Sequence, residues 1–491
     1  MDIHEQTRRE FLKKVGWGAT SLGVWQLSAG LLSAGEKRES GHTTCLYNEE
    51  YRPQFHFTPK QNWTNDPNGL VYYKGEYHMF FQRNPTGINW GNMTWGHAVS
   101  TDLIHWKQLA NAIKPDELGT IFSGSAVVDW NNTSGLQTGE ENVLVAFYTS
   151  AGEFAPVEKP YTQSLAYSND CGRTWVKYKD NPIIGHIIGA NRDPKVIWHE
   201  PSERWIMVLY LDENDFMLLW SKNLREWKQL QKLTLPESTE CPDFFELAVD
   251  GDPTDTRWVF WGANGRYLLG TFDGHKFTPQ SGPFESRVGN FYAAQTWSDI
   301  PKSDGRRIQI GWMAGGEFPG MPFNQQMSIP CELTLRRFSE GIQLCMVPVR
   351  EIAGLRDAEY SWKDINLKPG KNLLSEISAG LLEIQCEIEL SSTGWFGFRL
   401  RGARLAYNAK EQMLRCKRRK VRLAPIDGRL KLHILVDRTS IEVFGNDGRM
   451  SMFVCSPLDT DNKSVKIFAY GGDAKLRSLN LWKLRSIWPK S

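Results

Sequence analysis

A short polar-to-aromatic segment that recurs between residues 55 and 346 constrains the fold more than any other feature of the sequence. Each copy opens with polar residues that favour a turn and closes on an aromatic side chain that can pack beneath the next strand. The closing residues are Trp106, Trp175, Trp227 and, in a weaker copy, Phe277, at intervals of roughly 50 to 70 residues. This period is typical of the four-stranded blades of a β-propeller.

Each copy follows a nearly continuous apolar or aromatic run, which is the pattern of a buried strand. A fifth run of the same kind lies further along the chain, so the pattern predicts five blades over residues 50–347. The alternative is a β-sandwich in which the similarity between the segments is incidental. The runs are Tyr77–Phe81, Val143–Tyr148, Trp205–Tyr210, Trp258–Trp261 and Ile308–Met313.

The pattern changes over residues 348–491, where apolar and polar residues alternate in short stretches. Asn446–Gly448 is a tight-turn signal between two of these stretches. We therefore predict an antiparallel β-sandwich here, and an all-β chain as a whole: a five-bladed β-propeller followed by a C-terminal β-sandwich. The basic run Arg415–Arg422 is expected on a solvated strand or turn, with no assigned function. The predicted strands are Leu381–Leu390, Trp395–Leu400, Leu430–Val436, Ser440–Phe444 and Ser464–Tyr470.

Composition limits the partners and cofactors. The chain carries 58 basic and 56 acidic residues, so its net charge does not suggest a nucleic-acid or membrane partner. The 10 His are scattered and none of the 8 Cys forms a C-x-x-C pair, so we expect no metal and no cofactor. One or two disulfides are possible in an exported protein. The 20 Trp can fill the core, but aromatic faces also suit sugar rings, and we expect a carbohydrate substrate.

Residues 1–35 carry a targeting signal. Arg8 and Arg9 precede a mildly apolar stretch rich in Gly, Ala and Ser, and the segment resembles a twin-arginine export signal. Gln26 and several Gly interrupt the stretch, which argues against a permanent membrane span. The segment has no clear A-x-A cleavage site, so its retention as an anchor is the alternative. We expect a periplasmic or extracellular protein.

Two aspartates each precede a proline. In Trp63–Gly69, Pro67 holds Asp66 toward extended geometry and the following Asn-Gly predicts a sharp turn, so Asp66 is expected at a strand end. The segment Asn191–Lys195 places Asp193 in the same way ahead of an apolar strand. Taken alone, each segment could also be a surface turn.

A third segment, Glu240–Glu246, surrounds its carboxylates with Cys, Pro and two Phe. Poor solvation raises the pKa of a carboxyl group, which suits a general acid near neutral pH. The residues alone do not choose among Glu240, Asp243 and Glu246. Cleavage of a glycosidic bond needs one acid to protonate the departing oxygen and one carboxylate to attack or steady the sugar carbon. A third carboxylate can orient the sugar ring through its hydroxyls.

The three motifs, in this order, resemble glycoside hydrolase family 32, which contains invertases, levanases and inulinases. The resemblance covers most of residues 55–488. It implies a five-bladed propeller, then a β-sandwich, with carbohydrate bound at the propeller axis. Further segments that carry it are Phe80–Pro85, Trp90–His97, Phe122–Ser125, Phe291–Gln295, Gly311–Met313 and Val436–Phe444.

The resemblance also implies roles for single residues. It makes Asp66 the nucleophile, Asp193 the transition-state stabiliser and Glu240 the acid/base, which settles the choice left open above. Together, the residues and the resemblance predict that substrate is bound by Trp63, Asn65, Gln82, Trp90, Trp95, Phe122, Ser123, Arg192, Tyr292 and Trp312.

We therefore expect a retaining hydrolase that releases fructose from β-D-fructofuranosides such as levan, inulin or sucrose through a covalent fructosyl-enzyme intermediate. Retention predicts a separation of about 5–5.5 Å between the carboxyl groups of Asp66 and Glu240. The alternatives are an arabinofuranosidase-like propeller glycosidase, a fructosyltransferase and an inactive fructan-binding protein. The sequence does not assign an oligomeric state.

Overall fold

The computed structural model describes residues 46–285, 287–391 and 393–488. The predicted export signal, residues 1–35, lies outside this range. The regular secondary structure of the described chain is almost entirely strand, and none of its helices has the length and apolar character needed to cross a membrane. The helices are short 3-10 turns: η1 (Gly152–Phe154), η2 (Glu200–Ser202) and η3 (Arg350–Leu355).

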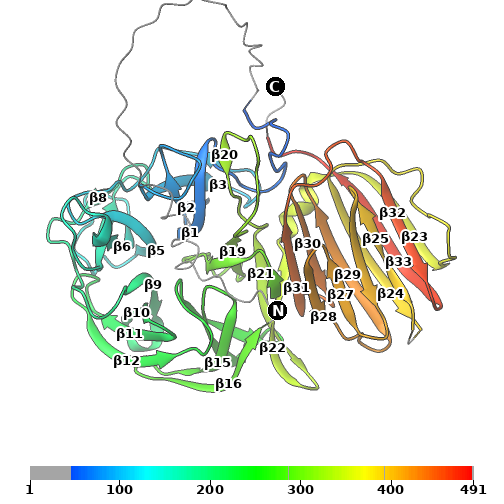
Figure 1. Ribbon diagram of the computed structural model, residues 1–491. Coiled ribbons are helices and arrows are strands. Elements are labelled where there is room, and N and C mark those ends of the chain that lie inside the picture. Colours follow the sequence, from blue (N-terminus) through cyan, green and yellow to red (C-terminus); the bar gives the residue numbers. More distant parts are fainter. Residues whose placement is uncertain (1–45, 286, 392, 489–491) are drawn as a thin grey trace, which may run out of the picture. The chain divides into compact units, whose positions relative to one another are not determined.

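The N-terminal part consists of antiparallel groups of four strands, one after another in the sequence (Figure 1). The fourth and fifth groups share one sheet through a single parallel pair, Val249 opposite Leu335. The groups are β1 (Asn62–Tyr73), β2 (Glu76–Asn84), β3 (Thr94–Ser100) and β4 (Lys107–Gln108); β5 (Thr120–Asp129), β6 (Val143–Ala151), β7 (Thr162–Ser168) and β8 (Val176–Lys177); β9 (Arg192–His199), β10 (Arg204–Asp212), β11 (Asp215–Ser221) and β12 (Lys228–Thr234); β13 (Asp243–Val249), β14 (Asp252–Trp261), β15 (Arg266–Phe272) and β16 (Phe277–Glu285); and β18 (Tyr292–Thr296), β19 (Arg307–Trp312), β21 (Cys331–Phe338) and β22 (Gly341–Pro348).

The first strands of these groups contact one another in a closed order. Strand β1 contacts β5, β5 contacts β9, β9 contacts β13, β13 contacts β18, and β18 returns to β1. Figure 1 shows β1, β5 and β9 nearest the centre, with β8, β12 and β16 at the outside. The arrangement is a β-propeller, as the sequence predicts, and it is consistent with five blades.

The recurring aromatic segments form the turn between the third and fourth strands of a blade. The indole N–H of Trp106 donates to the Leu103 carbonyl at 3.0 Å, and Trp227 donates to the Leu224 carbonyl at 2.9 Å. Both acceptor residues have a positive φ, 65° for Leu103 and 62° for Leu224. The polar opening of the segment therefore makes a turn, and the aromatic residue locks that turn, as expected.

A β-sandwich follows. One sheet has the order β17-β31-β30-β29-β24-β33-β23 and the other β28-β27-β26-β25-β32. Strand β17 (Arg287–Gly289) comes from the propeller part of the sequence and pairs in parallel with β31, so it joins the two domains. The others are β23 (Arg356–Asn366), β24 (Leu382–Leu390), β25 (Trp395–Leu400), β26 (Ala403–Asn408), β27 (Met413–Cys416), β28 (Arg419–Arg422), β29 (Arg429–Val436), β30 (Ser440–Gly445), β31 (Met450–Cys455), β32 (Val465–Tyr470) and β33 (Ala474–Leu484).

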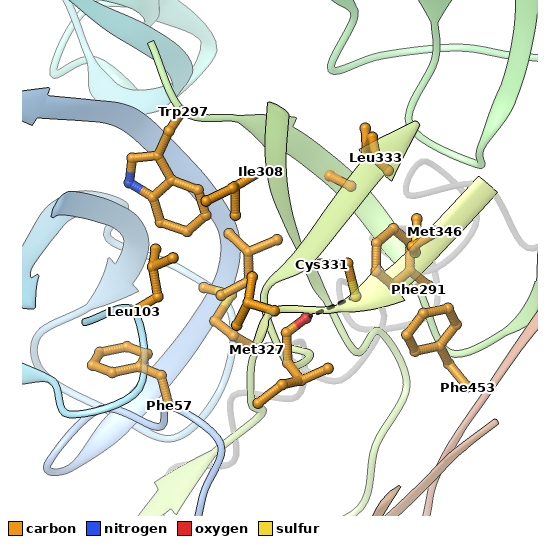
Figure 2. Close-up of a cluster of buried hydrophobic side chains, with 14 of the residues drawn as sticks. Phe57, Leu103, Phe291, Trp297, Ile308, Met327, Cys331, Leu333, Met346 and Phe453 are labelled. Carbon is orange, nitrogen blue, oxygen red and sulfur yellow. Dashed lines mark hydrogen bonds between the residues drawn. The ribbon is translucent and has the colours of Figure 1, made fainter. Parts of the chain in front are cut away.

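One apolar core runs from the first, fourth and fifth blades into the sandwich (Figure 2). The ring of Phe291, just before β18, packs on Phe453 of β31 with ring centroids 4.4 Å apart. Cys331 is buried in the same core, and its thiol donates to the Ile329 carbonyl at 3.4 Å. Buried apolar side chains therefore connect the propeller to the sandwich.

A buried charged cluster adds to this contact. His56 Nδ1 lies 2.8 Å from Asp437 Oδ2, and its Nε2 lies 3.1 Å from Glu442 Oε2. The backbone N–H of Gln54 and that of Ile329 donate to Asp437 and Glu442 respectively. These contacts fix the segment before β1 and the segment before β21 to one sheet of the sandwich.

Candidate active site

Asp66 lies inside β1, at an irregularity of the strand. The pairing of β1 with β2 shifts register between Thr64 and Pro67, and again between Asn68 and Val71. Proline cannot donate to a ladder, and such shifts re-aim side chains, as β-bulges do near functional sites. The expectation that Asp66 stands at a strand end before a sharp turn is therefore wrong, because the strand continues through Asn68-Gly69 to Tyr73.

The Asp66 carboxylate is fully buried, with 0% exposure, and is held on both oxygens. Ser123 of β5 donates to its Oδ2 at 2.5 Å, and the Asn65 amide donates to its Oδ1 at 3.0 Å. The Trp63 indole N–H in turn donates to Asn65 Oδ1 at 2.8 Å. Four residues that the sequence predicts for the site are thus joined in one hydrogen-bonded chain.

Asp193 lies at the start of β9, in the left-handed region of backbone conformation with a φ of 64°. Its own N–H donates to the Thr149 hydroxyl at 2.9 Å, which anchors it to β6. Its Oδ2 accepts the Cys241 backbone N–H at 3.1 Å. A non-glycine residue with this backbone conformation is uncommon, and such residues cluster at functional sites.

Glu240 lies in the turn before β13, where two consecutive residues have positive φ: 54° for Glu240 and 36° for Cys241. Arg192 Nη2 donates to Glu240 Oε1 at 2.5 Å, and the Tyr292 hydroxyl donates to Oε2 at 2.7 Å. Glu240 is 3% exposed. Its two carboxylate oxygens are therefore held from the third blade and the fifth.

The Cys241 thiol links the acidic residues. Its Sγ lies 3.6 Å from Asp66 Oδ2 and 3.4 Å from Asp193 Oδ2. Arg192 joins the other pair, with Nε 3.8 Å from Asp193 Oδ2 and Nη2 on Glu240. The carboxylates that sequence motifs place far apart in the chain thus meet around one residue, Cys241, and one guanidinium.

The structure separates Glu240 from the two other acids of its segment. Asp243 is buried behind the site, where Oδ1 lies 3.3 Å from Lys195 Nζ and Oδ2 accepts the Thr296 N–H at 2.6 Å. Glu246 is exposed on β13 and accepts a hydrogen bond from Thr256 at 2.6 Å. Of the three, Glu240 alone is joined to Asp193 through Arg192.

Charge and burial fix the protonation of the groups that hold Glu240. Burial lowers the pKa of Arg192, but the neighbouring Glu240 and Asp193 carboxylates outweigh it and raise that pKa above the ordinary arginine value. Burial, together with the charge of Glu240, raises the pKa of Tyr292 well above its usual range. Arg192 is therefore a permanent cation and Tyr292 a permanent phenol, so both are donors to Glu240.

Aromatic rings border this cluster. Trp312 of β19 makes edge contacts with Trp63 at 6.2 Å and with Tyr292 at 6.3 Å, and its N–H donates to Gln325. Trp90 and Phe122 lie 6.0 Å apart, and Phe122 directly precedes Ser123, the donor to Asp66. Trp63, Tyr292 and Trp312 therefore lie together beside the carboxylates, and Phe122 and Trp90 are linked to them through Ser123.

Two further predicted residues differ in their surroundings. Gln82 of β2 is buried, and its side-chain Oε1 is an acceptor without a hydrogen-bond partner among the described residues. Trp95 is buried with 0% exposure in the core between the first two blades, against Phe80 and Tyr148. Its N–H donates to the Phe122 carbonyl at 2.9 Å, so the prediction that it lines the sugar pocket is corrected to a supporting role beneath Phe122.

The sequence analysis missed residues that lie at the site without belonging to its motifs. Tyr210 of β10 is opposite Arg192 in the sheet, and the guanidinium lies 4.7 Å above its ring. Phe154 of η1 contacts Trp90 at 5.5 Å and Phe122 at 5.8 Å. Thr149 of β6 accepts the Asp193 backbone N–H. Thr149 and Tyr210 lie on the apolar strands β6 and β10, and Phe154 follows β6; the composition of these strands indicates burial and does not reveal contact with the site.

Metal ligands are not gathered here. Within residues 46–285, 287–391 and 393–488, the structure contains no group of three or more His, Cys, Asp or Glu side chains arranged to hold a metal ion.

Two family models together match nearly the whole described chain. The N-terminal domain model of glycosyl hydrolases family 32 matches residues 56–348, and the C-terminal model of the same family matches residues 351–483. The chain belongs to glycosyl hydrolase family 32. It is a glycosidase with the propeller and sandwich of that family.

Relatives within family 32 agree with this. A levanase of Bacillus subtilis (strain 168) is 41% identical over 493 residues, which cover 91% of this chain and 72% of that protein. An extracellular exo-inulinase of Aspergillus awamori is 31% identical over 519 residues, covering 90% of this chain and 96% of that protein. The crystal structure of exo-inulinase from Aspergillus awamori superposes with a TM-score of 0.81 at 29% identity, over 90% of this chain and 100% of that one.

Proposed function

We propose that the protein is a retaining β-fructosidase that releases fructose from β-D-fructofuranosides such as levan, inulin or sucrose. The family and the fructan-degrading relatives support the substrate class. The observation that carries the mechanism is the meeting of Asp66, Asp193 and Glu240 around Cys241 and Arg192. Two carboxyl groups in separate environments are what a retaining glycosidase requires.

In the first step, Glu240 in its acid form protonates the glycosidic oxygen while Asp66 attacks the anomeric carbon of the fructosyl unit. The bond between this carbon and the departing oxygen breaks, and an ester bond to Asp66 forms. Ser123 and Asn65 donate to the two Asp66 oxygens and fix the attacking atom. Such fixed donors remove the need to reorganise the site during the reaction.

In the second step, the Glu240 carboxylate accepts a proton from water, the resulting hydroxide attacks the anomeric carbon, and the ester to Asp66 breaks. Fructose leaves with the configuration it had in the substrate, because two displacements have occurred at one carbon. Asp193 faces the ring and stabilises positive charge on it. Arg192 and Tyr292 hold Glu240 in place through both proton transfers.

The remaining predicted residues bind the sugar. Gln82 Oε1 and Trp90 Nε1 are buried polar atoms without a partner among the described residues, which leaves them available to substrate hydroxyls. Aromatic rings would pack on the apolar face of the fructose. We assign contacts with substrate to Trp63, Asn65, Gln82, Trp90, Phe122, Ser123, Arg192, Tyr292 and Trp312.

A substrate panel tests the proposed function. Purified protein is incubated with levan, inulin, sucrose and an aryl arabinofuranoside, and products are followed over time. We expect fructose from the fructosides and none of the aryl alcohol from the arabinoside. Release of arabinose, accumulation of longer fructosides in place of free fructose, or binding of levan without release of fructose would each contradict the proposal and favour one of the alternatives.

We further propose that the protein is exported, by the twin-arginine route, through residues 1–35. An extracellular relative supports the destination, and Arg8-Arg9 supports the route. Replacing both arginines by lysine should keep the protein in the cytoplasm of a host with that pathway, measured by cell fractionation. Unchanged export of this variant would rule out the route but not the destination.

A further inference from the structure

One sheet of the sandwich, β28-β27-β26-β25-β32, has an outward face that catalysis does not use (Figure 1). Along β25 the buried residues alternate with outward ones, Trp395 and Arg399. Along β32 the outward residues are Lys466, Phe468 and Tyr470. This alternation follows from the pleat of a strand with one buried face, so the outward residues are free to form a surface of their own.

Three cations stand in a row across this face. Arg399 of β25 is directly opposite Lys466 of β32 on one side and Arg404 of β26 on the other. Like charges that face each other across a sheet are destabilising. The described residues that line the depression here include these three cations and Lys371 but no carboxylate. The row therefore concentrates positive charge at this depression.

Aromatic rings stand beside the cations. Trp395 and Tyr470 stack with centroids 6.3 Å apart and an interplanar angle of 19°, and Phe468 stacks with Tyr470 at 5.9 Å and 25°. The Arg404 guanidinium lies 5.3 Å from the Trp395 centroid and donates to the Tyr470 hydroxyl at 2.5 Å. Tyr470 is 42% exposed, so part of its ring is accessible on this face.

The sheet is hollowed between these groups. A depression of about 450 Å³ lies here, lined by Arg399, Arg404, Lys466, Phe468 and Tyr470 together with Lys371. A second one of about 500 Å³, lined by Arg401, Arg404, Arg415 and Lys417 with Asp459, adjoins it through Arg404.

The second depression includes part of the basic run Arg415–Arg422, which the sequence analysis left without a function. The run forms the end of β27, a turn and β28 of the same sheet, and most of it is solvent-exposed, as expected. The net charge of the chain is only +2, so these cations reflect local segregation of charge and not a basic composition.

We propose that this face binds an acidic polysaccharide, a chain of sugar rings that carry carboxylate groups. Guanidinium groups match carboxylates in paired, charge-assisted hydrogen bonds, and the C–H faces of sugar rings pack on aromatic rings. The ligand would neutralise the row of Lys466, Arg399 and Arg404 and cover Trp395 and Tyr470. The site lies on the sandwich and is independent of the catalytic carboxylates and of the proposed function.

Binding of polygalacturonate by the full-length protein tests this proposal. We expect saturable binding that weakens steeply as salt is added, because screening acts on exposed charges. The triple variant Arg399→Gln, Arg404→Gln, Lys466→Gln should bind at least tenfold more weakly. The matched control Lys222→Gln, Lys276→Gln, Lys302→Gln removes exposed lysines of the propeller and should bind as the unchanged protein does. Equal binding by both variants would overturn the proposal.

Two further measurements separate a polysaccharide from other polyanions. Trp395→Ala should weaken polygalacturonate binding several-fold while its circular dichroism and thermal transition match those of the unchanged protein. Vesicles of equal parts phosphatidylglycerol and phosphatidylcholine should bind more weakly than polygalacturonate and be indifferent to Trp395→Ala. No detectable binding of polygalacturonate, tighter binding of the vesicles, or equal binding of neutral dextran would each overturn the assignment.

Discussion

Arg192 and Tyr292 donate to the two oxygens of Glu240 from the third and fifth blades, so each influences how readily that carboxyl group gives up its proton. A donor to a carboxylate stabilises its charged form, and its removal favours the acid form. Tyr292→Phe should therefore lower kcat/KM by about ten- to hundredfold and move the alkaline limb of the kcat/KM profile to higher pH. A pH profile that keeps its alkaline limb would show that Tyr292 does not act through Glu240.

Tyr210 positions Arg192 through a contact between its ring and the guanidinium. Its ring lies below the guanidinium, and burial raises the pKa of its phenol to about 12, so the ring stays neutral. Tyr210→Leu removes the ring face and should lower kcat about tenfold through loss of the cation–π contact, with KM nearly unchanged. Tyr210→Phe keeps the face and serves as the matched control; an equal loss in both variants would assign the effect to the hydroxyl instead.

The sequence could single out a candidate site residue only where a recognisable motif contains one acidic residue suited to the chemistry. Asp66 and Asp193 stand out as Asp-Pro pairs, although each segment alone could also be a surface turn, and Glu240 could not be told from Asp243 and Glu246 by the residues alone. The distinction depends on partners that are distant in the chain: Arg192 for Glu240, Lys195 for Asp243. Trp95 was predicted beside the sugar but packs in the core against Phe80 and Tyr148, because its local sequence does not distinguish these two settings.

At the scale of single elements, replacement of Gly69 tests the packing and backbone conformation of the irregular strand β1. Its φ is +53°, and a Cβ there would lie 2.5 Å from Phe80 Cδ2. Gly69→Ala should therefore lower the free energy of unfolding by about 2–4 kcal/mol, through overpacking and backbone strain together. Denaturant unfolding measures it. Gly75→Ala is the matched control.

Gly75 also has a positive φ, +87°, but a Cβ there would meet nothing within 4 Å. Its replacement should lower the free energy of unfolding by only about 1 kcal/mol, the cost of backbone strain. Equal losses in the two variants would show that the contact with Phe80 is not what requires glycine at position 69.

Strands were predicted well where burial alone explains their apolar composition. Each of the five apolar runs forms the second strand of its group, where both faces are buried. The recurring aromatic turns were found most clearly in the three copies that end in Trp, where the indole N–H makes the same local hydrogen bond. The irregularity of β1 escaped prediction because Asn68-Gly69 is a turn signal in isolation, and β17 escaped because its partner, β31, is far along the chain.

At the scale of the molecule, the His56 cluster ties the propeller to the sandwich and makes stability depend on pH. Burial lowers the pKa of His56, but Glu442 and Asp437 outweigh it and raise that pKa to about 9 from an ordinary value of 6.5. Because the folded-state pKa lies above the unfolded one, the stabilisation is complete below pH 6.5 and is lost as pH rises through 9.

The free energy of unfolding should therefore fall by about 3 kcal/mol across this window, measured by denaturant titration at successive pH values. In Glu442→Gln one of the two carboxylates that raise the His56 pKa is gone, while the amide oxygen can still accept the Ile329 N–H. The loss should then occur at lower pH. An unchanged window in this variant would show that Glu442 does not set the His56 pKa.

The most direct test of the central claim is to trap the fructosyl-enzyme intermediate. Turnover of a fructoside with a good leaving group is stopped rapidly in acid, the protein is digested, and the mass of each peptide is compared with and without substrate. The account predicts one added fructosyl unit on the peptide that contains Asp66, its absence in Asp66→Asn, and β-configured fructose as the first product. An unmodified Asp66 peptide together with first-formed fructose of inverted configuration would contradict it.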